Sequence, residues 1–183
     1  MESRQGAGCT VVSRTASRGF QVPGGRVALA RAQLASVYEL RMELEGGAAA
    51  LAAMRRSDDD LARMAACLAR LGNHLSHADD DGVEQDIGFH AAIAVATHNT
   101  YYQQLLQYLN LQVRAAVRIA RENTQQTQAE LVHDVHLEHV ALYEAIAAGD
   151  PQRARAAAVL HLRRAAARLK LEFPSFDLES TTS

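Results

Sequence analysis

The fold is decided by residues 83–97, which read VEQDIGFHAAIAVAT. Steps of three and four residues along this stretch connect Val83, Asp86, His90, Ile93 and Thr97. Such spacing places these side chains on one face of a helix. Most of the face is apolar, but two ionisable groups interrupt it. The stretch therefore predicts a helix whose buried side carries a carboxylate and an imidazole.

The same helical periodicity continues through the chain from residue 27 onward. The expected helices cover residues 29–54, 58–76, 80–98, 100–121, 126–148 and 151–171. Only three prolines occur in 183 residues, and residues 24–150 contain none, which favours helices over β structure. We expect an all-α fold, an antiparallel bundle of about six helices. The expected domain covers residues 29–172, with a tail over residues 173–183.

Two short motifs mark helix boundaries. Ser57 is followed by three aspartates, which favour the free N–H groups at a helix start. Gly149, Asp150 and Pro151 combine a helix stop, a capping residue and a first helical position. Residues 1–28 differ from the rest: they are glycine-rich and basic, and alternate as two short strands around a turn would. We interpret them as a hairpin fragment, tail or linker.

Composition excludes several classes of protein. Lys and Arg number 19 and Asp and Glu number 21, a net charge of −2 that fits neither a basic nucleic-acid coat nor an acidic disordered chain. Two cysteines, Cys9 and Cys67, make no disulfide framework. No apolar run approaches the roughly 20 residues that span a bilayer, and no signal peptide is apparent. We expect a cytoplasmic protein with no membrane association.

Polar residues interrupt the predicted buried stripes of three further helices. The first helix has one polar member, Arg41, in the stripe Leu34, Val37, Arg41, Leu44, Ala48 and Leu51. In the fifth, His139 stands in the stripe Val132, Val135, His139, Leu142 and Ile146. In the sixth, His161 stands in the stripe Ala154, Ala158, His161, Ala165 and Leu169. An arginine, an aspartate and three histidines are thus expected to face one interior.

One metal ion would explain Asp86, His90, His139 and His161 together, because a buried charge is costly unless it is paired or metal-bound. Helical bundles build metal sites from side chains on facing helices in this way. We expect one divalent transition metal, with zinc first and nickel, manganese or iron as alternatives, since ligand type does not choose among them. The alternative is that each histidine is a hydrogen-bonded core residue and that Asp86 and His90 form a surface pair.

Other ionisable residues have weaker claims. His136 is the chief competitor to His139, one turn away on the same helix. Helical geometry turns Glu138 away from the face that carries His139, and it gives Glu45 no clear role. Metal-assisted hydrolysis also needs a base beside the bound water, so the pattern does not favour an enzyme.

The chain resembles a known family in five blocks, which occur in the family's order over about residues 30–170; one of them is ATHN at residues 96–99, which resembles a helix end of the family. The run YELRMELE at residues 38–45 resembles the start of the FCD ligand-binding domain, the effector domain of the FadR subfamily of GntR transcription regulators. Residues 86–90, DIGFH, match its D-x-x-F-H segment. Residues 139–150 and the pair His161 and Leu162 match its later blocks.

The resemblance implies a bundle of six or seven helices around a central metal held by Asp86, His90, His139 and His161. Family effectors are small organic acids that often bind at the metal. Arg41 matches a family arginine that faces the pocket, and its planar fork suits a carboxylate. Asn99 matches a polar family position near the pocket, although it would serve equally well as a helix N-cap.

The resemblance also implies a homodimer and a winged helix-turn-helix module before this domain. Here only residues 1–28 precede it, and residues 10–22 resemble the wing hairpin that ends that module. The sequence would then be a truncated form, a gene product read from a late start, or a natural effector-only protein. We expect DNA binding only through the module that this sequence mostly lacks. The predicted function is metal-dependent sensing of an organic acid; the alternatives are a metal-free interaction or dimerisation module and, less favoured, a metal-dependent enzyme.

Overall fold

A computed structural model describes residues 31–73, 82–127 and 129–173 of the chain. These residues form six helices and no strand. The helices are α1 (Arg31–Arg55), α2 (Asp58–Asn73), α3 (Val83–Ala96), α4 (Thr100–Thr127), α5 (Ala129–Ala147) and α6 (Pro151–Arg168). The prediction of an all-α bundle of about six helices is confirmed. The hairpin expected over residues 1–28 lies outside the described residues. So do residues 174–183 of the expected tail.

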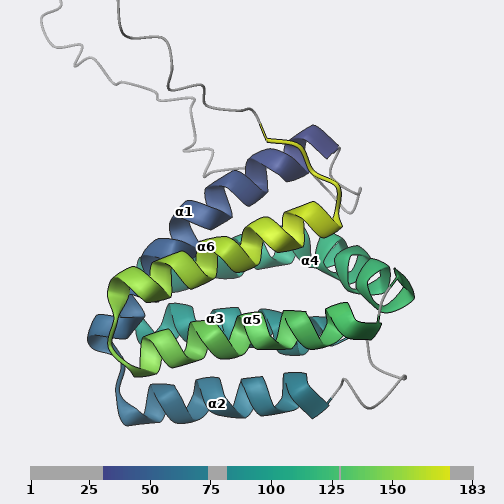
Figure 1. The fold of residues 1–183 in the computed structure, drawn as a ribbon. Coiled ribbons are helices and arrows are strands. Elements are labelled where there is room, and N and C mark those ends of the chain that lie inside the picture. Colours follow the sequence, from purple (N-terminus) through teal and green to yellow (C-terminus); the bar gives the residue numbers. More distant parts are fainter. Residues whose placement is uncertain (1–30, 74–81, 128, 174–183) are drawn as a thin grey trace, which may run out of the picture.

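The helices form stacked layers in Figure 1. Helices α1 and α6 lie side by side and run in opposite directions, and they make the most extensive helix–helix contact of the bundle. Helices α3 and α5 occupy the middle, and α2 packs against both of them on the side away from α1. Helix α1 also contacts α3, α4 and α5. It therefore touches every helix that carries one of the predicted ligands.

Both predicted boundary motifs are present. The Oγ atom of Ser57 accepts a hydrogen bond from the Asp60 amide, while Oδ2 of Asp60 accepts from the amide and hydroxyl of Ser57. This reciprocal pair closes the start of α2 as a capping box does. At the other motif, Asp150 Oδ1 accepts from the amide of Arg153 at 2.9 Å and caps α6, and Gly149 adopts φ +71° just before it.

Several predicted boundaries moved: α5 begins at Ala129 instead of residue 126, and α6 ends at Arg168 instead of residue 171. Helix α3 begins at Val83 instead of residue 80, because Gly82 takes a left-handed conformation that does not continue a helix (φ +62°). Helix α4 continues to Thr127, beyond the expected end at residue 121. In the part of the chain that the structure describes, no helix is long and apolar enough to cross a bilayer.

Candidate metal centre

Three helices bring the four predicted ligands together. Helix α3 supplies Asp86 and His90, α5 supplies His139 and α6 supplies His161. All four are buried, and one possible ligand atom from each lies within 4.8 Å of the others. The ring centroids of His139 and His161 are 4.3 Å apart, and those of His90 and His161 are 5.2 Å apart. Their role as ligands is a prediction that this geometry supports.

Each histidine has an oxygen atom beside its Nδ1. These oxygens belong to Glu45 for His90 (2.6 Å), to the Val135 carbonyl for His139 (2.8 Å) and to Glu138 for His161 (2.9 Å). Carbonyl and ionised carboxylate oxygens only accept hydrogen bonds, so each neutral ring must carry its proton on Nδ1. The Nε2 lone pair of every ring is then available. Metal-binding histidines in proteins are held by acceptors of this kind.

Two of these Nε2 atoms have no hydrogen-bond partner. They belong to His90 and His139, and both are buried. Burying a polar atom without a partner costs about 1–3 kcal/mol. Nε2 of His139 also lies 3.3 Å from Oδ1 of Asp86, which sets a lone pair against a carboxylate oxygen when the ring is neutral. A divalent cation between these atoms would turn that repulsion into coordination, so the residues fit a metal ion.

The electrostatics of the cluster favour an ionised aspartate and a neutral His161. Burial opposes ionisation of Asp86, but its close contact with His139 and the other nearby imidazoles lower the pKa of this carboxyl well below its usual range. Burial, helped by His139, lowers the pKa of His161 to about 4. Metal ligands must be deprotonated to bind, so both shifts prepare these two residues for coordination near pH 7.

Glu138 is a functional candidate to which the sequence analysis assigned no role. Its side chain does leave the face of α5 that carries His139, as expected, but it then reaches α6. There it is buried and contacts His161, Arg164 and Arg168, the two arginines at 3.4 Å. Burial raises the pKa of Glu138, yet its hydrogen bond with His161 and the charge of Arg168 outweigh burial and lower it.

Glu45 corrects the predicted stripe of α1. Glu45 is 5% exposed and Ala52 is fully buried, whereas Leu44 and Leu51, which the stripe contained, are only partly buried. Burial opposes ionisation of Glu45, but Arg41 and His90 outweigh it and lower the pKa to about 2. Val37, Arg41 and Ala48 of the predicted stripe are buried as expected, but Glu45 and Ala52 replace Leu44 and Leu51 on the buried face. Ion pairing is what lets the carboxylate of Glu45 occupy the interior.

Of the two predicted effector residues, Arg41 lies in the interior and Asn99 lies at the start of α4. Arg41 faces the interior as expected: it is 3% exposed, its Nε lies 2.6 Å from Glu45 Oε1, and its guanidinium lies over the Tyr38 ring. Asn99 caps α4 instead, since its Oδ1 accepts from the amide of Tyr101 at 3.0 Å. The N-cap alternative is therefore observed for Asn99, and a contact with an effector remains a prediction.

The remaining histidines lie outside the cluster or outside the described residues. His136 packs against Gly72 on α2, with its Cε1 3.0 Å from where a Cβ would be. His98 lies between α3 and α4, and its Nε2 is 2.9 Å from the buried carboxylate of Asp60. No sequence pattern signalled this pairing. His74 and His77 lie outside the described residues.

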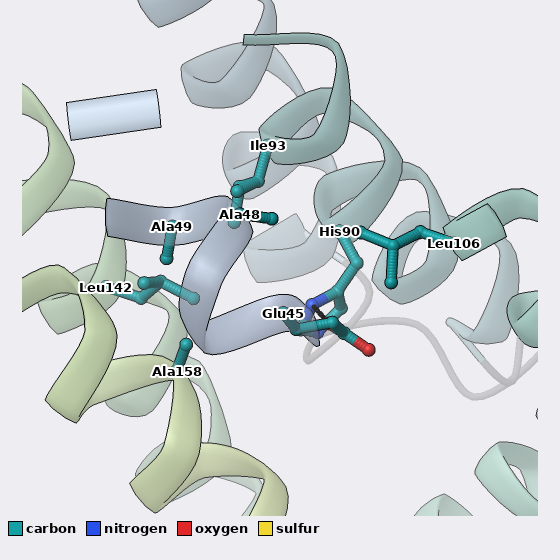
Figure 2. A pocket seen from close by; sticks show the side chains of 8 residues that line it. All are labelled: Glu45, Ala48, Ala49, His90, Ile93, Leu106, Leu142 and Ala158. Atoms are coloured by element: carbon teal, nitrogen blue, oxygen red, sulfur yellow. Dashed lines mark ion pairs between the residues drawn. The ribbon is translucent and has the colours of Figure 1, made fainter. Parts of the chain in front are cut away.

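A small cavity adjoins the cluster at His90. It is lined by Glu45, Ala48, Ala49, His90, Ile93, Leu106, Leu142 and Ala158, as Figure 2 shows. Glu45 and His90 form its polar end, and the other walls are apolar. Its free space is about that of one water molecule. An organic acid would therefore fit only after side chains around the cavity move.

Comparison with known proteins gives a consistent picture. A family model described as the FCD domain matches residues 36–164. The HTH-type transcriptional regulator LutR of Bacillus subtilis strain 168 is 28% identical over 163 residues, which are 88% of this chain and 74% of LutR. A protein of Escherichia coli K12, provisionally named as the regulatory protein of an L-lactate dehydrogenase operon, is 29% identical over 126 residues.

That alignment covers 69% of this chain and 47% of the Escherichia coli protein, so the chain spans about half the length of this relative. Among solved structures, Streptococcus agalactiae GntR is similar with a TM-score of 0.60 and 23% sequence identity. The similarity covers 74% of this chain and 57% of that protein. At this identity, the likeness shows a shared fold.

Proposed function

The chain belongs to the FCD domain family, and we propose that it senses a small carboxylate effector for a GntR-type transcription regulator, with one divalent transition metal at its centre. The relatives reported above are named as transcription regulators, which confirms the prediction that this domain is regulatory and not enzymatic. A regulator of this kind would act in the cytoplasm, where its operator lies.

The cluster of Asp86, His90, His139 and His161 carries the proposal. Three imidazoles in the Nδ1–H form and one ionised carboxylate suit zinc, nickel, manganese or iron, and we propose zinc first. These four side chains would hold the ion, and a bound ion would supply positive charge and an open position for an effector oxygen. Two buried Nε2 atoms without hydrogen-bond partners are the observation that most directly supports coordination.

Arg41 is the residue that we propose to bind the effector carboxylate. Its bond to Glu45 uses Nε, so the terminal nitrogens provide the fork that matches a carboxylate. Because the adjoining cavity holds only about one water molecule, effector binding must displace side chains between helices. We propose that this displacement changes the bundle, and that a winged helix-turn-helix module converts the change into altered operator affinity.

We also propose that the domain is a homodimer. Leu111 and Ile119 on α4 are 62% and 48% exposed, and Tyr101 at the start of the same helix is 81% exposed. Large apolar side chains grouped on one exposed helix favour an interface. This observation also favours the second candidate function, a metal-free dimerisation module. Light scattering on the protein and on Leu111→Asp tests the interface, with Leu160→Asp, at an exposed leucine on α6, as the control.

The experiment that tests the proposed function combines metal analysis with ligand binding. The chain is purified without chelators, its metal content is measured, and L-lactate is titrated while thermal unfolding is followed. Lactamide, which lacks the carboxylate, is the control. We expect about one metal ion per chain. We also expect Tm to rise when a carboxylate is added and to stay unchanged when lactamide is added. A metal-free protein that is dimeric and unaffected by a panel of organic acids would favour the dimerisation module.

A further inference from the structure

One buried carboxylate contacts both halves of the proposed site. Oε2 of Glu45 lies 2.6 Å from Nδ1 of His90, and Oε1 lies 2.6 Å from Nε of Arg41. All three side chains are nearly inaccessible to solvent. Figure 2 shows Glu45 reaching from α1 to His90 at the polar end of the cavity. A predicted metal ligand and the predicted effector arginine thus share a single acidic residue.

The contacts of Glu45 require a carboxylate. His90 and Arg41 each donate an N–H, so the residue between them must offer two acceptor oxygens. A glutamine has one acceptor oxygen and one NH₂ group. Whichever way its amide turned, one of the two donors would face another donor. The geometry therefore requires the two acceptor oxygens of a glutamate, and not only its negative charge.

We propose that Glu45 is a positioning residue that couples metal binding at His90 to effector binding at Arg41. This inference rests on the proposed function. When an effector carboxylate binds Arg41, the hydrogen bond from Arg41 to Oε1 of Glu45 becomes weaker. More of the negative charge of Glu45 then acts on the Nδ1–H of His90. His90 then becomes a stronger donor through Nε2. Metal and effector each strengthen the binding of the other, because coupling between sites is reciprocal.

Glu138 provides an internal comparison. It also lies between a predicted ligand, His161, and arginines, but Arg164 and Arg168 are 3.4 Å away, and Arg164 is largely exposed. Its arginines lie on α6 beside His161, whereas Arg41 lies on α1 and His90 on α3. Glu45 therefore connects residues of two helices through short contacts to both partners, which makes it the carboxylate suited to carry coupling.

The first test measures zinc affinity by competition with a chromogenic chelator. Glu45→Gln should weaken zinc binding by roughly 10-fold or more while the stoichiometry stays at one, since the ligands are intact. Glu39→Gln is the matched control, because Glu39 is exposed on the same helix. Circular dichroism checks the fold. Glu45→Asp keeps both acceptors but withdraws them by one methylene, and it should also weaken zinc binding.

A spectroscopic readout separates positioning from loss of structure. In cobalt-loaded protein, the Nδ1–H protons of the three coordinating imidazoles give exchangeable, paramagnetically shifted NMR signals. Glu45→Gln should shift one of the three, or lose it to solvent exchange, and leave the other two in place. A uniform change of all three would show general loosening of the site and would overturn the positioning role.

A double-mutant cycle tests whether Arg41 acts on the zinc site through Glu45. Arg41→Gln should change zinc affinity when Glu45 is present, and this change should differ by about threefold or more when position 45 carries glutamine. Equal changes in both backgrounds, or wild-type zinc affinity in Glu45→Gln and Glu45→Asp, would overturn the inference while leaving the metal site intact. Absence of zinc binding by the wild-type chain would overturn the inference and the proposed function together.

Discussion

Oε2 of Glu138 on α5 lies 2.9 Å from Nδ1 of His161 on α6, across 23 residues of sequence. Both side chains are buried, and the carboxylate can only accept from the ring. This contact fixes the His161 tautomer and turns its Nε2 toward the cluster.

The first prediction concerns this contact. Glu138→Gln leaves every proposed ligand in place but replaces a charged acceptor by a weaker one, so zinc affinity should fall roughly 10-fold. Chelator competition measures the change. Glu144→Gln is the control, because Glu144 is exposed on the same helix. Equal zinc affinities for Glu138→Gln and Glu144→Gln would show that the contact does not act on the metal site.

The second prediction concerns acid stability away from the cluster. Burial raises the pKa of Asp60, but hydrogen bonds from Ser57 and the charge of His98 outweigh burial and lower it. A lowered pKa in the folded state stabilises the protein above the unfolded value of about 4, and this contribution is lost as pH falls through the folded pKa.

Asp60→Asn should therefore cost about 1 kcal/mol of unfolding free energy at pH 7, with a smaller difference from wild type near pH 3. Urea unfolding with a chelator present measures both values without a metal contribution. Asp59→Asn serves as the control, since Asp59 is exposed one residue earlier. A destabilisation that is the same at both pH values would refute the assigned role of the charge.

The third prediction concerns the effector. Arg41→Lys keeps the positive charge but removes the planar fork, so the affinity for the proposed carboxylate effector, probed with the organic acid that raises Tm, should fall by about 10-fold or more while zinc stays at about one per chain. Calorimetry on zinc-loaded protein measures the affinity. Arg63→Lys, at a largely exposed position, is the control. If Arg41→Lys binds that organic acid as tightly as the wild type does, Arg41 does not contact the effector.

Periodicity and capping chemistry were enough to predict the helices and to select four residues that meet in space. Asp86 and His90 share one turn of α3, and His139 and His161 each interrupt an apolar stripe, so each position could be read within its own helix. The choice of His139 over His136 rested on helical phase and on the family resemblance, and the structure places His139 in the cluster and His136 against Gly72.

Glu45 and Glu138 could not be identified in this way, because burial of a carboxylate depends on partners from other helices. Apolar periodicity predicts that Leu44, and not Glu45, is buried in α1. Only the positions of Arg41 and His90 explain why Glu45 is buried. The contact between Asp60 and His98 joins α2 to the α3–α4 connection, and no local pattern reports it.

The central claim is that Asp86, His90, His139 and His161 bind one metal ion. Metal analysis of the wild-type chain beside His139→Ala and His136→Ala tests it most directly, since these histidines lie one turn apart on α5 and only His139 is in the cluster. The account predicts about one zinc per wild-type chain, retained in His136→Ala and lost in His139→Ala. A wild-type protein that binds no divalent metal, or retention in His139→Ala with loss in His136→Ala, would contradict it.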